Sequence, residues 1–321
     1  MRLAVAIAAL AMASPAHAQP VSAHAMVHTC CTPSAAVERA FRDADRLGAN
    51  YIRVDVELPY DRRGLDEVIR LSRRYRLPVL GILVTPRDFT NAEAYGRLAG
   101  EAAERAGGAI RHWEVLNEPD AGWAFAGTPE QYALMLNAAH DAVKSADPGA
   151  AVVLGGLQDP RRTAWLERVL ATPGADALHK FDIAALHLRG PVEPVVRRYR
   201  EFSAWLAGRG FRGPVWVTEH GYSADPAHQV DPAYADGEPS QAAYLTESLL
   251  ALGEAGAPEV FVTLRDNPEL APQYADEGIV GRPAFAAVRR VADDWGRLVT
   301  MRAAFRAGAE VAALLRAATG G

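Results

Sequence analysis

The feature that most constrains the fold is a series of eight short apolar runs, each followed by a segment with helical periodicity. Consecutive runs begin 28 to 44 residues apart, and a parallel strand with its crossover helix and loops needs about 30 residues or more. Most runs are continuously apolar, as expected for strands covered on both faces. They are Ser22–His28, Asn50–Val56, Pro78–Val84, Ile110–Leu116, Ala151–Leu157, Phe181–His187, Pro214–Glu219 and Pro258–Leu264.

The segments between the runs carry helix signals. Thr128 is a good cap for a helix with Pro129 at its first position, and the segment from Arg63 to Tyr75 spaces its leucines, isoleucine and valine along one face. The predicted helices are Ser34–Leu47, Arg63–Tyr75, Glu93–Ala106, Pro129–Lys144, Arg162–Leu170, Pro194–Leu206, Gln241–Leu252 and Ala284–Asp294.

Eight alternating units predict a single (β/α)8 barrel, residues 19–296, followed by one more amphipathic helix, residues 297–321, packed on its outside. A doubly wound open sheet is the alternative. That fold usually has a Gly-rich phosphate-binding turn after its first strand, and the turn here, Cys30-Cys31-Thr32-Pro33, contains no glycine.

The first 18 residues are typical of an export signal. Arg2 provides the positive start, Leu3–Met12 the apolar run, and Ala16-His17-Ala18 the small-residue cleavage site. An N-terminal membrane anchor is the alternative, but the apolar run is far shorter than the ~20 residues that span a bilayer. We therefore expect an exported protein, periplasmic or extracellular, without a membrane span.

Composition and cysteine content narrow the range of partners. The net charge of −5, with no cluster of Lys and Arg, argues against a nucleic-acid binder. The two cysteines, Cys30 and Cys31, are adjacent, so a vicinal disulfide, free thiols and an intermolecular bridge all remain open. Two partly buried small residues are the favoured interpretation. Since there are only two cysteines and no zinc-type spacing, we see no metal site of the thiolate kind. We also expect no cofactor and a monomeric protein.

Two of the runs end in glutamate. Asn117-Glu118-Pro119 closes the fourth run, and Glu219 closes the seventh. Because the carboxyl ends of barrel strands meet at one rim, the two side chains can converge there. One carboxylic acid can then protonate a leaving oxygen while the other, ionised, attacks an anomeric carbon. Carboxyl groups ~5–5.5 Å apart predict retention of configuration, and ~6.5–9.5 Å predicts inversion.

These residues carry a family resemblance that covers nearly the whole mature chain. Trp113-Glu114-Val115-Leu116-Asn117-Glu118-Pro119 resembles the strand-4 motif of clan A glycoside hydrolases, and Val217-Thr218-Glu219-His220-Gly221 resembles their strand-7 motif. The segment from Thr128 to Leu157 is similar to bacterial family 39 enzymes. The resemblance implies an O-glycosyl hydrolase with a retaining mechanism, Glu118 as acid/base and Glu219 as nucleophile. It also implies that Asn117 binds the sugar 2-hydroxyl and that Arg53 lies beneath Glu219 and keeps it ionised.

Other candidate substrate-binding residues are His187, Trp123 and Tyr222, the last two as platforms for a sugar ring. The chain departs from the family where His187-Leu188-Arg189 replaces the usual His-Pro-Tyr, and where Leu264-Arg265 replaces an aromatic platform. A non-catalytic carbohydrate-binding barrel is therefore one alternative. A metal-dependent hydrolase that uses His24, His28, His187 and Asp residues is another, although His24 and His28 are far apart along one strand.

Overall fold

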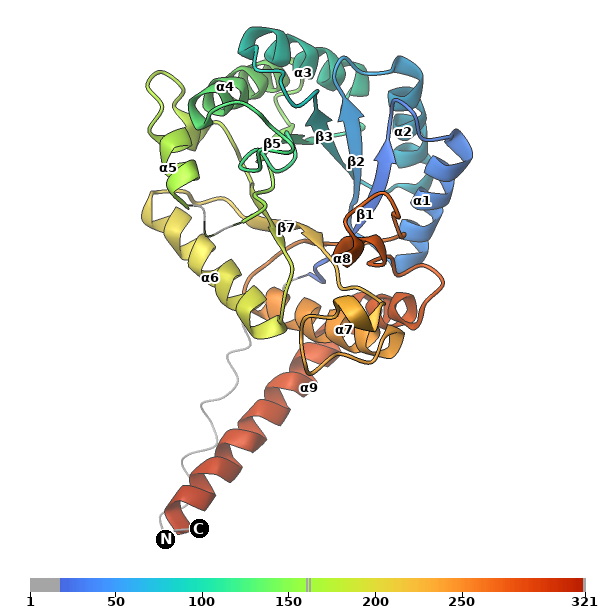
Figure 1. The fold of residues 1–321 in the computed structure, drawn as a ribbon, viewed down its shortest axis with the longest axis vertical. Coiled ribbons are helices and arrows are strands. Elements are labelled where there is room, and N and C mark those ends of the chain that lie inside the picture. The colour runs from blue at the N-terminus through green and yellow to red at the C-terminus, as the bar shows by residue number, and fades with distance from the viewer. Residues whose placement is uncertain (1–17, 160, 162, 320–321) are drawn as a thin grey trace.

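Eight parallel strands form one barrel with the helices outside it (Figure 1). The structure is a computed structural model and describes residues 18–159, 161 and 163–319. The strands pair in the order β5-β4-β3-β2-β1-β8-β7-β6, and parallel bridges between Val153 and Ile183 and between Leu157 and Leu186 join the two ends. The strands are β1 Val21–His28, β2 Ile52–Glu57, β3 Val79–Val84, β4 His112–Val115, β5 Ala151–Leu154, β6 Ala184–Leu188, β7 Val215–His220 and β8 Val260–Thr263. The predicted (β/α)8 barrel is confirmed.

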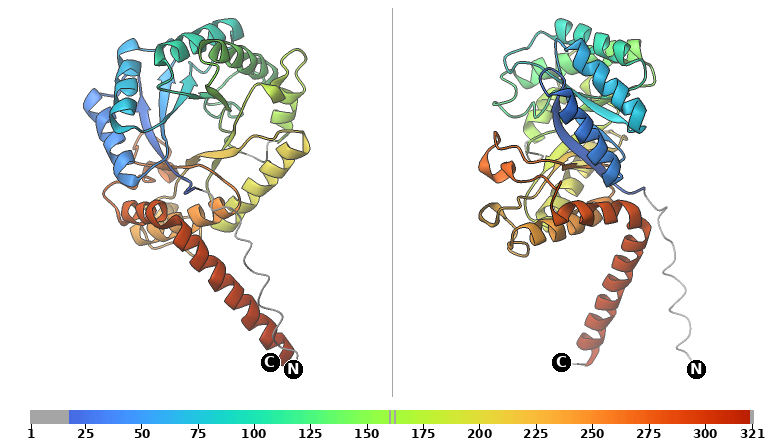
Figure 2. Two further views of the ribbon diagram at one scale, coloured as in Figure 1. Left: turned by 180° about the vertical axis from the view of Figure 1, so that it is seen from behind. Right: turned by 90° about the vertical axis from the view of Figure 1, so that its right-hand side faces the viewer.

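A helix follows each strand and lies on the outside of the barrel (Figure 2). Thr128 caps α4 as predicted, in a reciprocal pair of hydrogen bonds with Gln131. Arg162, the predicted start of the fifth helix, lies outside the described residues. The helices are α1 Ser34–Leu47, α2 Arg62–Tyr75, α3 Ala92–Ala106, α4 Pro129–Ala146, α5 Thr163–Leu170, α6 Val192–Gly208, α7 Glu238–Glu254, the short α8 Pro272–Ala275, and α9 Pro283–Thr319, with single 3-10 turns at Ala177–His179 and Pro226–His228.

The barrel interior is filled at the amino-terminal ends of the strands. Leu80, Trp216 and Phe261, which lie near the starts of β3, β7 and β8, form an apolar layer with Ile183. Tyr51 packs against Trp216, with ring centroids 5.0 Å apart. A second, larger apolar layer lies between strands and helices. This layer closes the amino-terminal part of the barrel interior, while buried His187 and Glu219 lie toward the carboxyl ends of β6 and β7.

The last helix, α9, is two helices joined at Asp294, whose backbone is non-helical. This break falls where the predicted eighth helix ends. Beyond it, Arg302 and Arg306 form ion pairs with Glu254 on α7 at 3.2 and 2.8 Å. Figures 1 and 2 show the last turns running away from the barrel. The division into a signal, residues 1–18, a barrel, residues 19–296, and a C-terminal helix packed on the barrel, residues 297–321, remains a prediction.

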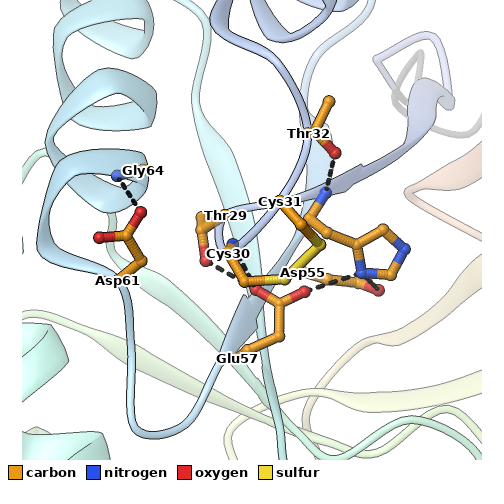
Figure 3. Close-up of a disulfide and its surroundings, with 9 residues drawn as sticks. Thr29, Cys30, Cys31, Thr32, Asp55, Glu57, Asp61 and Gly64 are labelled. Carbon is orange, nitrogen blue, oxygen red and sulfur yellow. Dashed lines mark hydrogen bonds and ion pairs between the residues drawn. A yellow bond between two sulfur atoms is a disulfide. The ribbon is translucent and has the colours of Figure 1, made fainter.

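The first 17 residues lie outside the described part of the chain, and the predicted export signal lies there apart from Ala18. Among the described residues, no helix combines the length and the apolarity that crossing a membrane requires. The favoured interpretation of the cysteines was wrong. Cys30 and Cys31 are both exposed, and they are joined to each other by a disulfide in the loop after β1 (Figure 3).

Candidate active site

The two glutamates reach the same rim from opposite sides of the barrel. Glu219 lies within β7, whereas β4 ends at Val115, three residues before Glu118. Leu116 and Glu118 have positive φ angles of 62° and 44°, and the Glu118 amide donates to the Gly156 carbonyl at 3.1 Å. Non-glycine residues in this region are strained, and such strain is concentrated at functional sites. The fourth strand is therefore shorter than predicted, and a left-handed turn directs the Glu118 side chain.

His187, on β6, lies between the two carboxylates. Its Nδ1 atom is 2.7 Å from Oε1 of Glu118 and 3.6 Å from Oε2 of Glu219. Ligand atoms of the three residues all lie within 4.8 Å of one another, and all three side chains are buried. This upper limit on the distance between carboxylate oxygens lies below the ~6.5–9.5 Å between the carboxyl groups of inverting glycosidases and is compatible with the ~5–5.5 Å of retaining ones.

Two arginines hold the Glu219 carboxylate. Arg53 donates to Oε1 at 2.7 Å, and Arg189 donates to Oε2 from both terminal nitrogens at 3.2 Å. Burial alone would raise the pKa of Glu219, but the electrostatic influence of His187 and of the two arginines holds that pKa well below its ordinary value. Glu219 is therefore ionised in the folded protein across the neutral range.

Arg53 is itself fixed on its other side. Its Nε donates to Glu114 at 2.8 Å, and one terminal nitrogen donates to Oδ1 of Asn117 at 2.8 Å. Glu114 is fully buried and also accepts from the Gly156 amide at 2.8 Å. Since Asn117 accepts through its carbonyl oxygen, its –NH2 group is the end that can donate to a sugar hydroxyl.

Three charged residues of this network were missed by sequence reasoning: Glu114, Arg189 and Glu277. Arg189 pairs with Glu277 through two hydrogen bonds of 2.7 and 2.9 Å. A Cβ atom at Gly221 would lie 2.3 Å from Oε2 of Glu277, so glycine leaves the room that this carboxylate fills. For Glu114, inside the fourth apolar run, and Arg189, just after the sixth, the available signal was a charge in or near an apolar run, since a buried charge needs a partner. Glu277 lies outside the runs and gave no such signal.

The other predicted residues lie in different surroundings. Trp123 is 62% exposed in the loop between β4 and α4. The ring of Tyr222 is buried and stacks on Tyr244 with centroids 3.8 Å apart, while its hydroxyl donates to the Tyr234 carbonyl at 2.8 Å. Tyr222 thus holds the loop after β7 and offers no open face to a sugar. Arg265 forms an ion pair with Asp43.

His24 does not join a group of possible metal ligands among the described residues. Its Nε2 atom is 3.3 Å from Arg53, and burial lowers its pKa to about 3. Within the described part of the chain, two groups could hold a cation by geometry: Glu118 with His187 and Glu219, and His28 with Asp55 and Glu57. In the first group, Arg53 and Arg189 already supply positive charge to Glu219, which disfavours a metal ion there.

No protein-family model matches the chain, and no curated protein matches its sequence. Solved structures of glycoside hydrolases do resemble it. A family 39 glycoside hydrolase from the gut symbiont Bacteroides cellulosilyticus WH2 is 19% identical over 86% of this chain, with a TM-score of 0.64. A glucosidase from Croceicoccus marinus is 16% identical over 86%, with a TM-score of 0.66. A GH5_18 protein from Streptomyces cattleya, solved with Manβ1-4GlcNAc, is 17% identical over 85%, with a TM-score of 0.59.

These likenesses cover 64%, 68% and 81% of the three proteins. The chain thus spans less than two thirds of the Bacteroides enzyme. At such low identity they show the fold alone, and at that level the predicted likeness to clan A glycoside hydrolases, with a family 39 protein among the matches, is confirmed.

Proposed function

We propose that this protein is an exported retaining glycoside hydrolase that cleaves an O-glycosidic bond in an oligo- or polysaccharide. One observation carries the proposal. Two buried carboxylates from opposite sides of the barrel have oxygens within 4.8 Å of each other, and they differ sharply in surroundings. Two arginines hold Glu219, whereas Glu118 bonds to His187.

The different surroundings of Glu219 and Glu118 indicate which of them is the nucleophile and which is the acid/base. Glu219 is the nucleophile because arginines on both of its oxygens keep it ionised. Glu118 is the acid/base because its Oε1 shares a hydrogen bond with a histidine nitrogen, a group that can both give and take a proton.

The reaction is a double displacement. In the first step a Glu219 oxygen bonds to the anomeric carbon, the bond to the leaving oxygen breaks, and that oxygen takes the Glu118 proton. In the second step water gives a proton to Glu118 and attacks the same carbon, which releases Glu219. Two inversions at one carbon give net retention.

Beside the two glutamates, we assign substrate contacts to Asn117 and His187. Arg53 acts on the substrate indirectly, because it holds Glu219. The –NH2 group of Asn117 donates to the sugar 2-hydroxyl, a bond that strengthens as positive charge develops at the anomeric carbon. Trp123 stays a candidate platform for a sugar outside the reacting subsite. Tyr222 is not assigned a substrate contact, because its ring is buried and stacks on Tyr244. The proposed enzyme is a monomer that requires no cofactor for this chemistry and binds no nucleic acid.

Variants of the two glutamates test the proposal. On a panel of aryl glycosides, Glu219→Gln should lose turnover altogether. Glu118→Ala should still release a good leaving group such as dinitrophenol in a burst, and then stall. Azide should restart Glu118→Ala by replacing the activated water, giving a glycosyl azide of unchanged anomeric configuration.

A matched control is Glu104→Gln, which changes an exposed glutamate on α3 and should behave as wild type. Near-normal turnover by Glu219→Gln contradicts the assignment of the nucleophile. Binding of a sugar without any hydrolysis by the wild-type protein favours a carbohydrate-binding barrel instead.

A further inference from the structure

A second cluster of titratable side chains lies at the same rim and has no role in the reaction. His28 is the last residue of β1, and Asp55 and Glu57 are near the end of β2. The register pairs His28 with Asp55. Because side chains alternate along a strand, Asp55 and Glu57 share a face with Arg53. The side chains of Asp55 and Glu57 therefore lie on the same face of β2 as Arg53, and they are nearer to the rim than Arg53 is.

The three side chains converge on one point. Nδ1 of His28 is 2.8 Å from Oε1 of Glu57 and 3.3 Å from Oδ2 of Asp55, and one ligand atom of each residue lies within 4.8 Å of the others. In a tetrahedral zinc site with bonds of about 2.0–2.2 Å, neighbouring ligand atoms are about 3.3–3.5 Å apart. The Asp55 distance already fits, and Glu57 needs to move outward by roughly half an ångström.

The cluster is held in place by the loop that follows β1 (Figure 3). Oε2 of Glu57 accepts from the Thr29 hydroxyl at 2.8 Å and from the Cys30 amide at 3.1 Å, which leaves Oε1 facing the cluster. The Cys30–Cys31 disulfide lies in the same loop. A Cβ atom at Gly64 would lie 1.8 Å from the Thr29 carbonyl oxygen, so the start of α2 packs directly on the loop. Neighbours thus fix the orientation of Glu57, as outer contacts do for metal ligands.

We propose that His28, Asp55 and Glu57 bind a divalent transition-metal ion such as zinc at the rim of the barrel. Two carboxylates face one imidazole. A divalent cation neutralises the charges of both carboxylates, whereas a proton on His28 neutralises only one. An imidazole nitrogen with two carboxylate oxygens suits zinc, whereas calcium and magnesium prefer oxygen ligands alone. The half-exposed His28 side chain leaves a fourth position open to water.

Such a site was not expected from the sequence, because the expected absence of a metal site rested on cysteine spacing. Here the ligands come from two neighbouring strands, and the two sulfurs are bonded to each other. The contrast with the Glu118, His187 and Glu219 group supports the choice of site. That group has arginine partners on Glu219, whereas in the part of the chain that the structure describes Asp55 and Glu57 form ion pairs with His28 alone.

Zinc titration by isothermal calorimetry tests the proposal on untagged full-length protein whose disulfide is intact by a free-thiol assay. We expect one zinc per chain, little heat with calcium, and a dissociation constant that rises at least ~100-fold in His28→Ala, since even indirect metal contacts are worth roughly 10–100-fold. His179→Ala is the matched control because His179 pairs with a single carboxylate, Asp176, at 2.7 Å on the surface. It should bind zinc as the wild type does.

Asp55→Asn gives a second, less disruptive variant, and metal-free melting curves show whether each variant is folded. X-ray absorption at the zinc edge should find nitrogen and oxygen neighbours and no sulfur. Equal zinc affinity in wild type and in folded His28→Ala overturns the proposal, as does sulfur in the zinc shell. Hydrolytic activity takes no part in these measurements, so they stand apart from the proposed glycosidase.

Discussion

Replacing Glu259 with glutamine should make the protein more stable at neutral pH. Glu259 lies just before β8, and its side chain is buried at the amino-terminal end of the barrel. Oε2 lies 2.6 Å from the Ser22 hydroxyl, and the Asn50 amide contacts both oxygens at 3.1 Å. No positive partner is among these contacts. Burial therefore raises the pKa of Glu259 from 4.5 to about 8.

The size and sign of the effect follow from this shift. Below about pH 4.5 both the folded and the unfolded chain carry the proton, so the ionisation of Glu259 does not change the free energy of unfolding. Between 4.5 and about 8 the unfolded chain releases the proton while the folded chain keeps it. Stability therefore falls as pH rises through this window. At 1.36 kcal/mol per pH unit, the loss reaches roughly 3 kcal/mol by pH 7 and about 5 kcal/mol above pH 8.

Glutamine imitates the protonated form, because its –NH2 can donate to Ser22 while its oxygen accepts from Asn50. Urea unfolding from pH 4 to 8 should show Glu259→Gln about 3 kcal/mol more stable than wild type at pH 7 and equal to it near pH 4. Glu104→Gln should leave the pH profile unchanged, since Glu104 is exposed. Parallel profiles for wild type and Glu259→Gln refute the reasoning.

The remaining predictions concern the charges around Glu219. Arg189→Met leaves buried Glu277 without its cation, so denaturant titration should show a loss of about 3–5 kcal/mol. The same variant should move the acid limb of the kcat/KM profile to higher pH, because one cation that depresses the pKa of Glu219 is gone; an unchanged limb contradicts this. Gly221→Ala should cost about 1–3 kcal/mol by displacing Glu277. In Gly208→Ala the added methyl group, at the end of α6, has no atom within 4 Å, so this variant should instead be more stable than wild type by up to about 1 kcal/mol. Equal effects of the two alanines contradict the packing argument.

Local patterns were enough to predict the barrel and the position of its two glutamates. Continuous apolar runs at intervals near 30 residues fix alternating strands and helices, and a parallel barrel puts all strand ends at one rim whatever the sequence distance. For that reason Glu118 and Glu219 were predicted to converge. The contact of Arg53 with Glu219 came from the family resemblance, and the structure places the two side chains together.

What sequence could not supply were contacts between distant elements. Glu277 follows β8 and Arg189 follows β6, so their pairing depends on the curvature of the barrel and on the space at Gly221. Tyr222 has the composition of a sugar platform, yet the path of the loop after β7 brings Tyr244 against it. The early end of β4 depends on positive φ angles at Leu116 and Glu118, which no sequence rule for those residues predicts.

The most direct test of the central claim is the configuration of the first product. Proton NMR of the wild-type protein with an aryl glycoside that it cleaves resolves the two anomers before they interconvert in water. Carboxylate oxygens within 4.8 Å of each other predict that the first sugar released keeps the anomeric configuration of the substrate. Initial release of the opposite anomer contradicts the double displacement by Glu219 and Glu118.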